Sequence, residues 1–380
     1  MNVTNDDLDI VRDVKGYSTG YCWIDYLSNS EDCFFPEGAI TEVMGLKSCS
    51  KTTLILEAIA HYYARGGTKK VLYLDFERTV RNQKTYLRNI GFDIDDESKF
   101  NYQQPDTFQQ GAMYVLNLLR NNGKGEQQTD YAFIVVDTVA AMVPEQEKDN
   151  KFGETKQVGL RAKLMNEFCR NITSSLYPEG PAFIFVNQLY EDLSIKGPAA
   201  FGPTQYDSSS SNALKYYASF RVSLSLKGKI KDKAVNPFTY EEEENYVGSI
   251  IEAMAEKSKI GVPFRKARFI VKYGIGIDAV PTIINAGAKK PEDQPIVRVQ
   301  GNNALFAIRM GYNEKGEAEY TKNFRGIAQF QKHLYDNPSD LVKIAEQLSP
   351  LWKQTAEYVV STPKYKNGTC SESEESDEEL

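Results

Sequence analysis

The sequence has little of what several classes of protein depend on. Its 380 residues include two histidines, His61 and His333, and five cysteines that are scattered and lack the spacing of metal ligands. A histidine-based metal centre or catalytic triad is therefore nearly excluded, and reduced thiols are expected. No run of 18 apolar residues occurs, and residues 1–15 are polar and acidic, which argues against a membrane span and a signal peptide. With 41% hydrophobic residues, we expect a cytoplasmic protein with one sizeable core and a smaller second one.

Most of the excess negative charge lies at one end of the chain. The formal net charge is −7, but six acidic residues fall within the last ten, and the balance without them is about −1. An acidic segment of this density is expected to be disordered and to compete with an anionic ligand for a basic surface. A tail that only keeps the protein in solution is an equally good interpretation.

A phosphate-binding loop is the clearest motif in the chain. It lies between residues 39–44, which have the pattern of a buried strand, and residues 54–63, which have helical spacing. Backbone N–H groups would point at a polyphosphate, with Lys51 at the β- and γ-phosphates and the Thr52 hydroxyl on Mg²⁺. An ordinary turn rich in serine and lysine is the alternative. The predicted nucleotide-binding residues are Gly45, Leu46, Lys47, Ser48, Cys49, Ser50, Lys51, Thr52 and Thr53.

One position of this loop departs from the usual pattern. The residue before Lys51, normally a glycine, is Ser50. Holding a residue other than glycine at positive φ costs on the order of 1–2 kcal/mol. Since about 1.4 kcal/mol is a tenfold change in affinity, we expect nucleotide binding to be weakened or retuned and not lost.

Polar side chains follow three further predicted strands. Glu77, Asp137 and Gln188 each stand at or just beyond the end of a short apolar run typical of a buried strand. Ligands gather at the carboxyl ends of strands in an open parallel sheet. Glu77 is therefore a candidate to polarise the attacking water, Asp137 to bind Mg²⁺ and Gln188 to sense the γ-phosphate. Taken singly, each is also an ordinary strand end or helix cap, but together with the loop they predict a nucleoside triphosphatase.

The segment 189–211 has no periodic element over more than twenty residues. Structureless segments of that length are uncommon in compact domains and are usually functional or disordered. Because it begins directly after Gln188, a change in the bound nucleotide would be able to order or move it. This is a physical basis for coupling ATP to a second ligand.

The expected fold class is α/β, with a central mostly parallel sheet flanked by helices and a small C-terminal α/β domain. Antiparallel strands are predicted at 220–226 and 268–273, with basic residues 227–233 and acidic residues 241–244 on solvated edges, and 145–157 is predicted to be an exposed loop. The predicted division is 1–17 as a short N-terminal segment, 18–280 as the ATPase core, 281–362 as the small domain and 363–380 as a disordered acidic tail.

From Ser18 to about Leu348 the chain resembles the bacterial RecA recombinases and their phage relatives such as UvsX. The resemblance is carried by motifs whose order and approximate spacing agree with that family. They include Ser18-Thr19-Gly20, Lys51-Thr52-Thr53, Gln104-Pro105-Asp106-Thr107, Val135-Val136-Asp137-Thr138-Val139-Ala140-Ala141, Phe185-Val186-Asn187-Gln188, Asn212-Ala213-Leu214-Lys215-Tyr216-Tyr217-Ala218-Ser219, Pro263-Phe264, Tyr273-Gly274-Ile275-Gly276-Ile277 and Asp336-Asn337-Pro338.

The resemblance implies a RecA-type core that forms helical filaments on single-stranded DNA. ATP would lie between neighbouring protomers and serve homologous pairing and strand exchange with double-stranded DNA. By position, Glu77 is the hydrolytic glutamate, Gln188 senses the γ-phosphate, and Tyr86 stacks on adenine. Lys257 and Lys259 match the pair that reaches the ATP of the neighbouring protomer, so hydrolysis would require assembly. Head-to-tail contacts that do not close generate an open helix.

The resemblance also implies where DNA binds. Segments 145–158 and 189–211 match the two DNA-binding loops, which contact phosphates while an apolar residue wedges between bases. Mediator or single-strand-binding proteins are further possible partners. The DNA-binding positions implied are Lys163, Phe201, Gly202 and Asn212.

The sequence departs from the RecA pattern at several points. Besides Ser50, Ser210-Ser211 replace a glycine pair, Tyr190 stands where RecA has an arginine, and the 17 residues before Ser18 are far fewer than the N-terminal segment that links RecA protomers. We therefore expect DNA affinity, ATP turnover or the filament contact to differ. The alternatives are a RecA-fold nucleotide-binding filament or regulatory protein without strand exchange, and a hexameric helicase-type motor.

Overall fold

The structure is a computed structural model. It describes residues 14–28, 33–91, 93–120, 130–149, 159–191, 206–208, 212–235, 238, 240–289, 293–302 and 305–367. Among these residues, no helix is both long enough and apolar enough to cross a membrane. The predicted DNA-binding positions Phe201 and Gly202 lie outside the described residues, as do residues 368–380 of the predicted tail.

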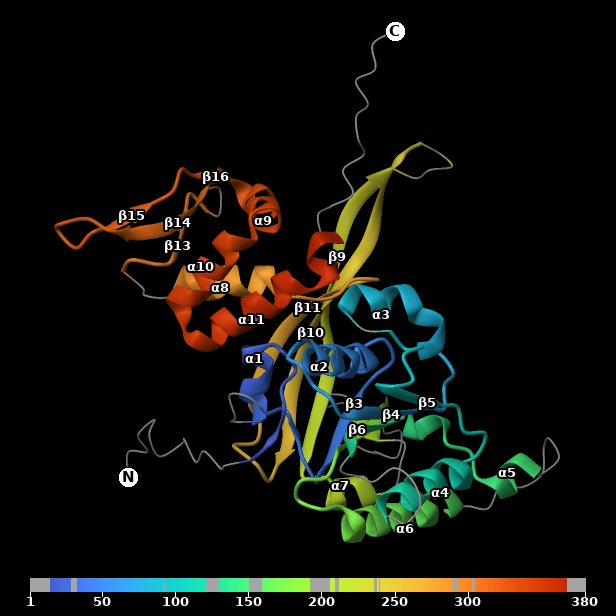
Figure 1. The fold of residues 1–380 in the computed structure, drawn as a ribbon. Coiled ribbons are helices and arrows are strands. Elements are labelled where there is room, and N and C mark those ends of the chain that lie inside the picture. The colour runs from blue at the N-terminus through green and yellow to red at the C-terminus, as the bar shows by residue number, and fades with distance from the viewer. Residues whose placement is uncertain are drawn as a thin grey trace, which may run out of the picture.

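One large mixed sheet organises the molecule (Figure 1). Its strands are β3 (Ile40–Gly45), β4 (Lys70–Asp75), β5 (Phe100–Gln103), β6 (Tyr131–Asp137), β7 (Ala182–Glu191), β8 (Tyr206–Ser208), β9 (Phe220–Val235), β10 (Glu242–Ser258), β11 (Lys266–Lys272) and β12 (Gly276–Asp278). They lie in the order β12-β11-β10-β9-β3-β7-β6-β4-β5, and β8 pairs with β7. The half from β9 to β5 is parallel, whereas β9 to β12 are antiparallel. The predicted α/β class is confirmed.

The parallel strands are apolar on both faces because helices cover both faces. Successive residues of a strand point to opposite sides, so in β6 Phe133 and Val135 join one buried cluster while Ile134 and Val136 join the other. The first cluster includes residues of α2 and α3, and the second includes residues of α4, α6 and α7. The helices of the core are α1 (Cys22–Asp25), α2 (Lys51–Ala64), α3 (Lys84–Ile90), α4 (Phe108–Leu119), α5 (Glu145–Asp149), α6 (Leu160–Ser175) and α7 (Ala213–Tyr217), with 3₁₀ turns at Tyr26–Ser28, Val80–Gln83 and Val139–Ala141 and a small sheet of β1 (Gly16–Tyr17) and β2 (Phe35–Pro36).

Strands β9 and β10 extend well beyond the sheet as a two-stranded arm (Figure 1). The predicted strand that ends at residue 226 was therefore too short, because β9 continues to Val235. Residues 227–233, predicted as a solvated edge, belong to β9, and its basic residues pair with the acidic residues of β10. Lys231 Nζ lies 2.7 Å from Glu244 Oε2, and Lys233 Nζ lies 3.0 Å from Glu242 Oε2. The side chains stay exposed, as expected, but they lie on a regular ladder.

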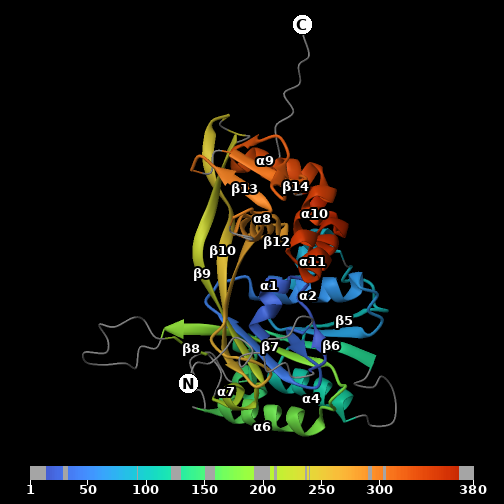
Figure 2. The ribbon, with the colours of Figure 1, turned by 90° about the vertical axis from the view of Figure 1, so that its left-hand side faces the viewer.

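The C-terminal elements stack on the α2 side of the core (Figure 2). They are α8 (Val280–Lys289), a small sheet of β13 (Val297–Gln300), β14 (Leu305–Tyr312), β15 (Ala318–Tyr320) and β16 (Phe324–Arg325), and the helices α9 (Gly326–Asp336), α10 (Pro338–Leu348), α11 (Pro350–Ser361) and α12 (Pro363–Asn367). Apolar residues of α8, α10 and α11 belong to the same buried cluster as those of α2. The C-terminal unit is α/β, as expected, and it shares a core with the nucleotide-binding part.

Helix α12 lies where the sequence predicts disordered tail, so that boundary needs correction. Lys364 is 3% exposed, and its ammonium donates to both carboxylate oxygens of Glu57 at 2.8 and 2.7 Å, to the Tyr21 hydroxyl at 2.6 Å and to the Ile277 carbonyl at 3.1 Å. We call Tyr21, Glu57 and Lys364 the Glu57 cluster. The sequence pattern hides this helix because it is only five residues long and its residue with most buried hydrogen bonds, Lys364, is charged.

Candidate nucleotide-binding site

The phosphate loop connects β3 to α2, and two of its serines adopt backbone conformations that favour glycine. Ser48 has φ 62° and Ser50 has φ 58°, both in the left-handed region, where each residue other than glycine costs on the order of 1–2 kcal/mol. Gly45 comes so close to β9 that an added Cβ would lie 2.5 Å from the Leu224 carbonyl oxygen. The expected strain at Ser50 is thus present, and the loop wraps tightly over the start of α2.

Lys51 is the first residue of α2, and its side chain spans the loop. Its ammonium donates to the carbonyl oxygens of Gly45 at 3.1 Å and Leu46 at 2.8 Å, and the residue is only 8% exposed. Burial lowers the pKa of Lys51, while the carboxylates of Asp137 and Glu77 act in the opposite direction. Both acids therefore lie within electrostatic reach of the lysine.

Asp137 is the buried last residue of β6 and lies between the hydroxyl groups of Thr52 and Tyr73. We call these three residues the Asp137 cluster. Thr52 Oγ1 donates to Asp137 Oδ2 at 2.7 Å, and the Tyr73 hydroxyl donates to the same oxygen at 2.6 Å. Burial raises the pKa of Asp137 to about 6, although both hydrogen bonds work to lower it. The other oxygen, Oδ1, is buried and has no hydrogen-bond partner. A buried carboxylate oxygen without a partner is costly unless a ligand satisfies it.

This donor set fits a hard cation that binds together with a nucleotide. Mg²⁺ takes oxygen ligands and is usually held by one or two carboxylate or hydroxyl groups plus phosphates and waters. Asp137 Oδ1 and the neighbouring Thr52 hydroxyl are such groups, and among the described residues no cluster of three or more acids, histidines or cysteines stands ready to hold an ion by itself. The Mg²⁺ ligands predicted from the sequence therefore suit an ion that arrives with phosphate.

Glu77, just beyond β4, lies in a hydrogen-bonded chain that joins three strand ends. Its Oε1 accepts from the Thr138 hydroxyl at 2.9 Å and from Gln188 Nε2 at 2.9 Å. Gln188 in turn accepts a hydrogen bond from the Tyr190 hydroxyl at 3.0 Å. Because β4, β6 and β7 are parallel, their carboxyl ends meet at one edge. The structure thus brings Glu77 and Gln188 into contact, and their catalytic roles stay predictions.

Buried polar residues that the sequence reading did not single out support this edge. Glu42 of β3 is fully buried, and its carboxylate accepts from Asn187 Nδ2 at 2.7 Å and from Arg221 Nε at 2.5 Å. Asn187 Oδ1 accepts from the backbone N–H of Gln188 at 3.0 Å. The signal was an acid inside an otherwise apolar strand, which requires a buried partner. Tyr73 and Thr138 gave no such signal, because a tyrosine in a strand and a threonine after one are ordinary.

Tyr86 lies on α3 and packs against the buried cluster that contains α2. The residue is partly exposed, its hydroxyl is buried, and burial raises the pKa of that hydroxyl well above its ordinary value. A ring held in this way is rigid enough to serve as a stacking surface. Stacking on adenine stays a prediction.

The two lysines expected to act on a neighbour lie at the end of β10, away from the loop of their own chain. Lys257 Nζ donates to the carbonyl oxygens of Lys215 at 2.7 Å and Tyr216 at 3.0 Å, at the C-terminal end of α7. Burial lowers the pKa of Lys257, and the positive charges of Lys259 and Arg221 lower it further. Three cations thus gather where α7 meets β9 and β10.

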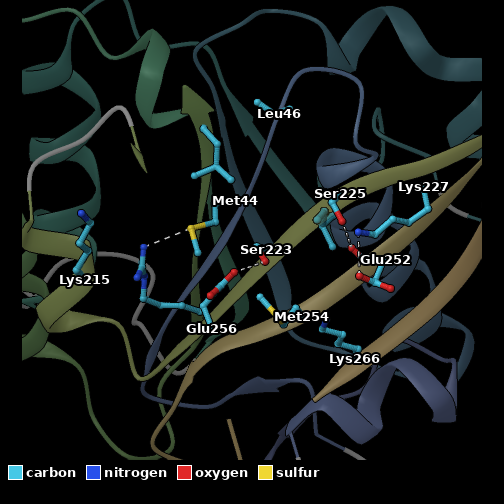
Figure 3. A pocket seen from close by; sticks show the side chains of 13 residues that line it. Met44, Leu46, Lys215, Ser223, Ser225, Lys227, Glu252, Met254, Glu256 and Lys266 are labelled. Carbon is cyan, nitrogen blue, oxygen red and sulfur yellow. Dashed lines mark hydrogen bonds and ion pairs between the residues drawn. The ribbon is translucent and has the colours of Figure 1, made fainter. Parts of the chain in front are cut away.

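A hollow of about 460 Å³ lies beside these cations and is lined mainly by side chains of β9 and β10, together with Lys215 of α7 (Figure 3). Within it Glu252 pairs with Lys227 at 3.1 Å, and Ser223 donates to Glu256 at 2.6 Å. Leu46 of the phosphate loop reaches its rim, but Lys51, Glu77, Asp137 and Gln188 do not line it. Lys227 and Glu252 offset each other in this hollow, and the candidate chemistry lies at the strand ends and not in it.

Of the predicted DNA-binding residues, two lie among the described residues and both are exposed. Lys163 is on α6, and Asn212 directly precedes α7. The segment 145–157, predicted to be an exposed loop, begins as α5, and Thr107 donates to Glu145 at 3.2 Å. That short helix needs a contact from α4 that no local pattern reveals. DNA binding by these positions stays a prediction.

A phosphate loop at the end of the first core strand, an acid at the end of β6 and covered parallel strands define a P-loop nucleotide-binding protein. Comparison with known proteins narrows this class. The family model "RecA N-terminal domain" matches residues 4–278, and the chain belongs to the RecA family. It is 29% identical over 334 residues to "Protein RecA" of Rickettsia massiliae, with 87% of each chain covered, and 30% identical over 334 residues to that of Rickettsia bellii, also with 87% of each covered. For "Protein RecA" of Borrelia duttonii the identity is 29% over 313 residues, with 80% of this chain and 77% of the relative covered.

Proposed function

We propose that this protein is a RecA-type recombinase: a DNA-dependent ATPase that assembles on single-stranded DNA and pairs it with homologous double-stranded DNA. Family membership supports the activity. The observation that carries the proposal is the meeting of the phosphate loop, Glu77, Asp137 and Gln188 at one edge of the sheet. These residues come from four parallel strands, β3, β4, β6 and β7, or from the loops after them, and a triphosphate is the ligand that would use all of them.

In this proposal Lys51, Asp137, Thr52 and Glu77 act from the positions described above. Lys51 would exchange its hydrogen bonds with the Gly45 and Leu46 carbonyls for contacts with phosphate, and it would neutralise phosphate charge. Although burial lowers the pKa of Lys51, an ammonium next to phosphate stays protonated. Mg²⁺ bound to the nucleotide would neutralise charge that develops on the phosphates. Asp137 and Thr52 would hold that ion, and Glu77, once released by Gln188, would orient the attacking water.

Assembly would complete the site. Lys257 and Lys259 lie at the end of β10, where Lys257 contacts the Lys215 and Tyr216 carbonyls, and we propose that both neutralise transition-state charge on the ATP of a neighbouring protomer, as an arginine finger does. A head-to-tail contact of this kind repeats without closing and yields a helical filament. Lys257 would exchange its hydrogen bonds to the Lys215 and Tyr216 carbonyls for contacts with phosphate.

We propose that DNA contacts α6, α7 and the segments 145–158 and 189–211, with Lys163, Phe201, Gly202 and Asn212 as the contacting residues. Sequence would be read by base pairing, and ATP would control assembly and release, because the exchanged duplexes are nearly isoenergetic. We place this activity in the cytoplasm, and include mediator or single-strand-binding proteins as partners in assembly.

The proposal is tested by measuring ATP turnover with and without single-stranded DNA and by imaging the protein with ATP and DNA in the electron microscope. DNA-stimulated turnover and open helical filaments are expected. Equal turnover in both conditions, with filaments present, would instead support a nucleotide-binding filament without strand exchange. Closed rings would support the helicase-type motor.

A further inference from the structure

Tyr190 makes a hydrogen bond that the function described above does not use. Its hydroxyl donates to Gln188 Oε1 at 3.0 Å, and Gln188 Nε2 donates to Glu77 Oε1 at 2.9 Å. Gln188 and Tyr190 are two residues apart on β7, so both side chains point to the same face of the strand. The three side chains form one chain of hydrogen bonds from β7 to the predicted hydrolytic glutamate.

The chemistry of the amide gives the Tyr190 hydroxyl a specific effect. A glutamine side chain has one acceptor oxygen and one nitrogen that only donates. While the Tyr190 phenol donates to its oxygen, the amide presents its nitrogen to Glu77, and a flipped amide would set its oxygen against the Glu77 carboxylate and lose that hydrogen bond. Glu77 Oε1 also accepts from Thr138 at 2.9 Å. This oxygen is therefore occupied by two donors and is not available to orient a water molecule.

The backbone around Tyr190 links it to the predicted DNA-binding segment. Tyr190 is paired with Asp207 in the antiparallel ribbon of β7 and β8, and that ribbon flanks residues 192–205, which lie outside the described residues. The Tyr190 residue is 51% exposed, so packing fixes it only in part and the ribbon sets much of its position. A ligand that twists or shifts the ribbon would move the hydroxyl away from Gln188.

We propose that Tyr190 is a positioning residue that holds Gln188 on Glu77 in the DNA-free protein, and that DNA bound beside the β7–β8 ribbon withdraws it. Gln188 is then able to turn toward the γ-phosphate, and Glu77 Oε1 becomes available to water. The inference rests on the proposed function, because it assigns to Tyr190 the restraint on DNA-free hydrolysis. It also gives a role to the residue that stands where the family has an arginine.

Tyr190→Phe tests this role by removing only the hydroxyl. A neutral hydrogen bond shifts an equilibrium by about two- to tenfold. We expect the DNA-free kcat for ATP to rise by about that factor, the DNA-stimulated kcat to stay within about twofold, and the KM for ATP to be unchanged. The ratio of the two kcat values would therefore fall, which a purely structural role of the ring would not produce.

The matched control is Tyr240→Phe, which removes the hydroxyl of an exposed tyrosine at the tip of the β9–β10 arm. It should leave both rates unchanged, and thermal melting of the three proteins verifies that they are equally folded. An unchanged DNA-free rate in Tyr190→Phe, or an equal fall of both rates, overturns the inference. If wild-type turnover does not respond to DNA, the proposed function fails instead, so the two failures are distinguishable.

Discussion

The Glu57 cluster and the Asp137 cluster are both buried and polar, but only one of them is satisfied. In the Glu57 cluster, Oε1 accepts from Lys364 and from the Ile277 N–H, and Oε2 accepts from Tyr21 and Lys364. In the Asp137 cluster, one oxygen accepts two hydroxyl hydrogen bonds and the other has no partner. A buried network in which every polar atom is hydrogen-bonded holds elements together. A network with an unpartnered atom leaves that atom available to a ligand, at a cost in stability.

The two clusters are joined by α2, which carries Lys51 and Thr52 at its start and Glu57 six residues into the helix. The Glu57 cluster fixes the helix to β12 and α12, while the Asp137 cluster meets its first turn. The start of α2 thus contacts Asp137, which has an unpartnered oxygen, while the Glu57 cluster anchors the helix further along its length. The predictions below test this comparison, beginning with the largest expected effect.

Lys51→Ala should abolish measurable ATP hydrolysis, a loss of at least about a hundredfold, because it removes the charge proposed to face the phosphates. DNA binding should weaken as well, since in the proposed function ATP controls assembly. Turnover and DNA binding are measured beside Lys315→Ala, which removes an exposed lysine in the C-terminal unit. Hydrolysis within tenfold of wild type in Lys51→Ala would contradict the assignment of the phosphate loop.

Lys364→Ala should lower the free energy of unfolding by about 3–5 kcal/mol, because it leaves the buried carboxylate of Glu57 without its counter-charge. The matched control is Lys353→Ala, which breaks an exposed pair with Glu346 on the helices α10 and α11 and should lower stability far less. Chemical denaturation measures both. Equal stability of the two variants would mean that α12 is not anchored by charge.

Asp137→Asn should stabilise the nucleotide-free protein by up to about 3 kcal/mol at pH 7, because the amide removes a charge from a buried site. The pKa of Asp137 is raised to about 6 in the folded state, so folding takes up a proton between about pH 4 and pH 6. Stability from the protonated acid is fully present below the unfolded pKa and is lost as the pH rises through 6.

The gain from Asp137→Asn should therefore appear above pH 6 and vanish below about pH 4. Melting curves at pH 4.5 and pH 7.5 without nucleotide measure it. The same variant should lose Mg²⁺-dependent stabilisation by ATP, whereas the wild-type protein should gain more from Mg²⁺ and ATP above pH 6 than below it. A variant less stable than wild type at pH 7.5 would show that the Asp137 carboxylate is satisfied after all.

Deletion of residues 371–380 should have the smallest effect. Because Lys364 is retained, the free energy of unfolding should change by less than about 0.5 kcal/mol, whereas duplex DNA uptake should become faster, most at low salt where repulsion by the tail is least screened. Stopped-flow uptake at two salt concentrations measures this beside the full chain. No change of rate at either salt concentration would leave the tail with a solubilising role only.

Sequence patterns predicted the parts of the site that depend on local order. The alternation around 39–44, the apolar runs before Asp137 and Gln188 and the helical spacing after Thr53 identify the strands and α2 from neighbouring residues alone. The rule that ligands gather at the carboxyl ends of parallel strands then brings Glu77, Asp137 and Gln188 to one edge. The unusual φ of Ser50 also follows from its place in the motif.

Long-range contacts were beyond these patterns. Nothing local to Lys364 signals that it pairs with Glu57, 307 residues away, and the reason for Gly276 is equally remote: an added Cβ there would lie 2.1 Å from Glu57 Oε1, at φ 108°. The length of the β9–β10 arm depends on pairing between Lys231 and Glu244 across a turn. Each of these cases is decided by a partner that the sequence does not place nearby.

By itself the sequence determined the α/β class, the phosphate loop and the family, because strand and helix periods and motif spacing are properties of neighbouring residues. Only the tertiary structure decided that Asp137 keeps an unpartnered oxygen, that Tyr190 donates a hydrogen bond to Gln188 and that α12 belongs to the core. The physical reason is that the satisfaction of a buried polar group depends on every element packed around it, and those elements are brought together only by folding.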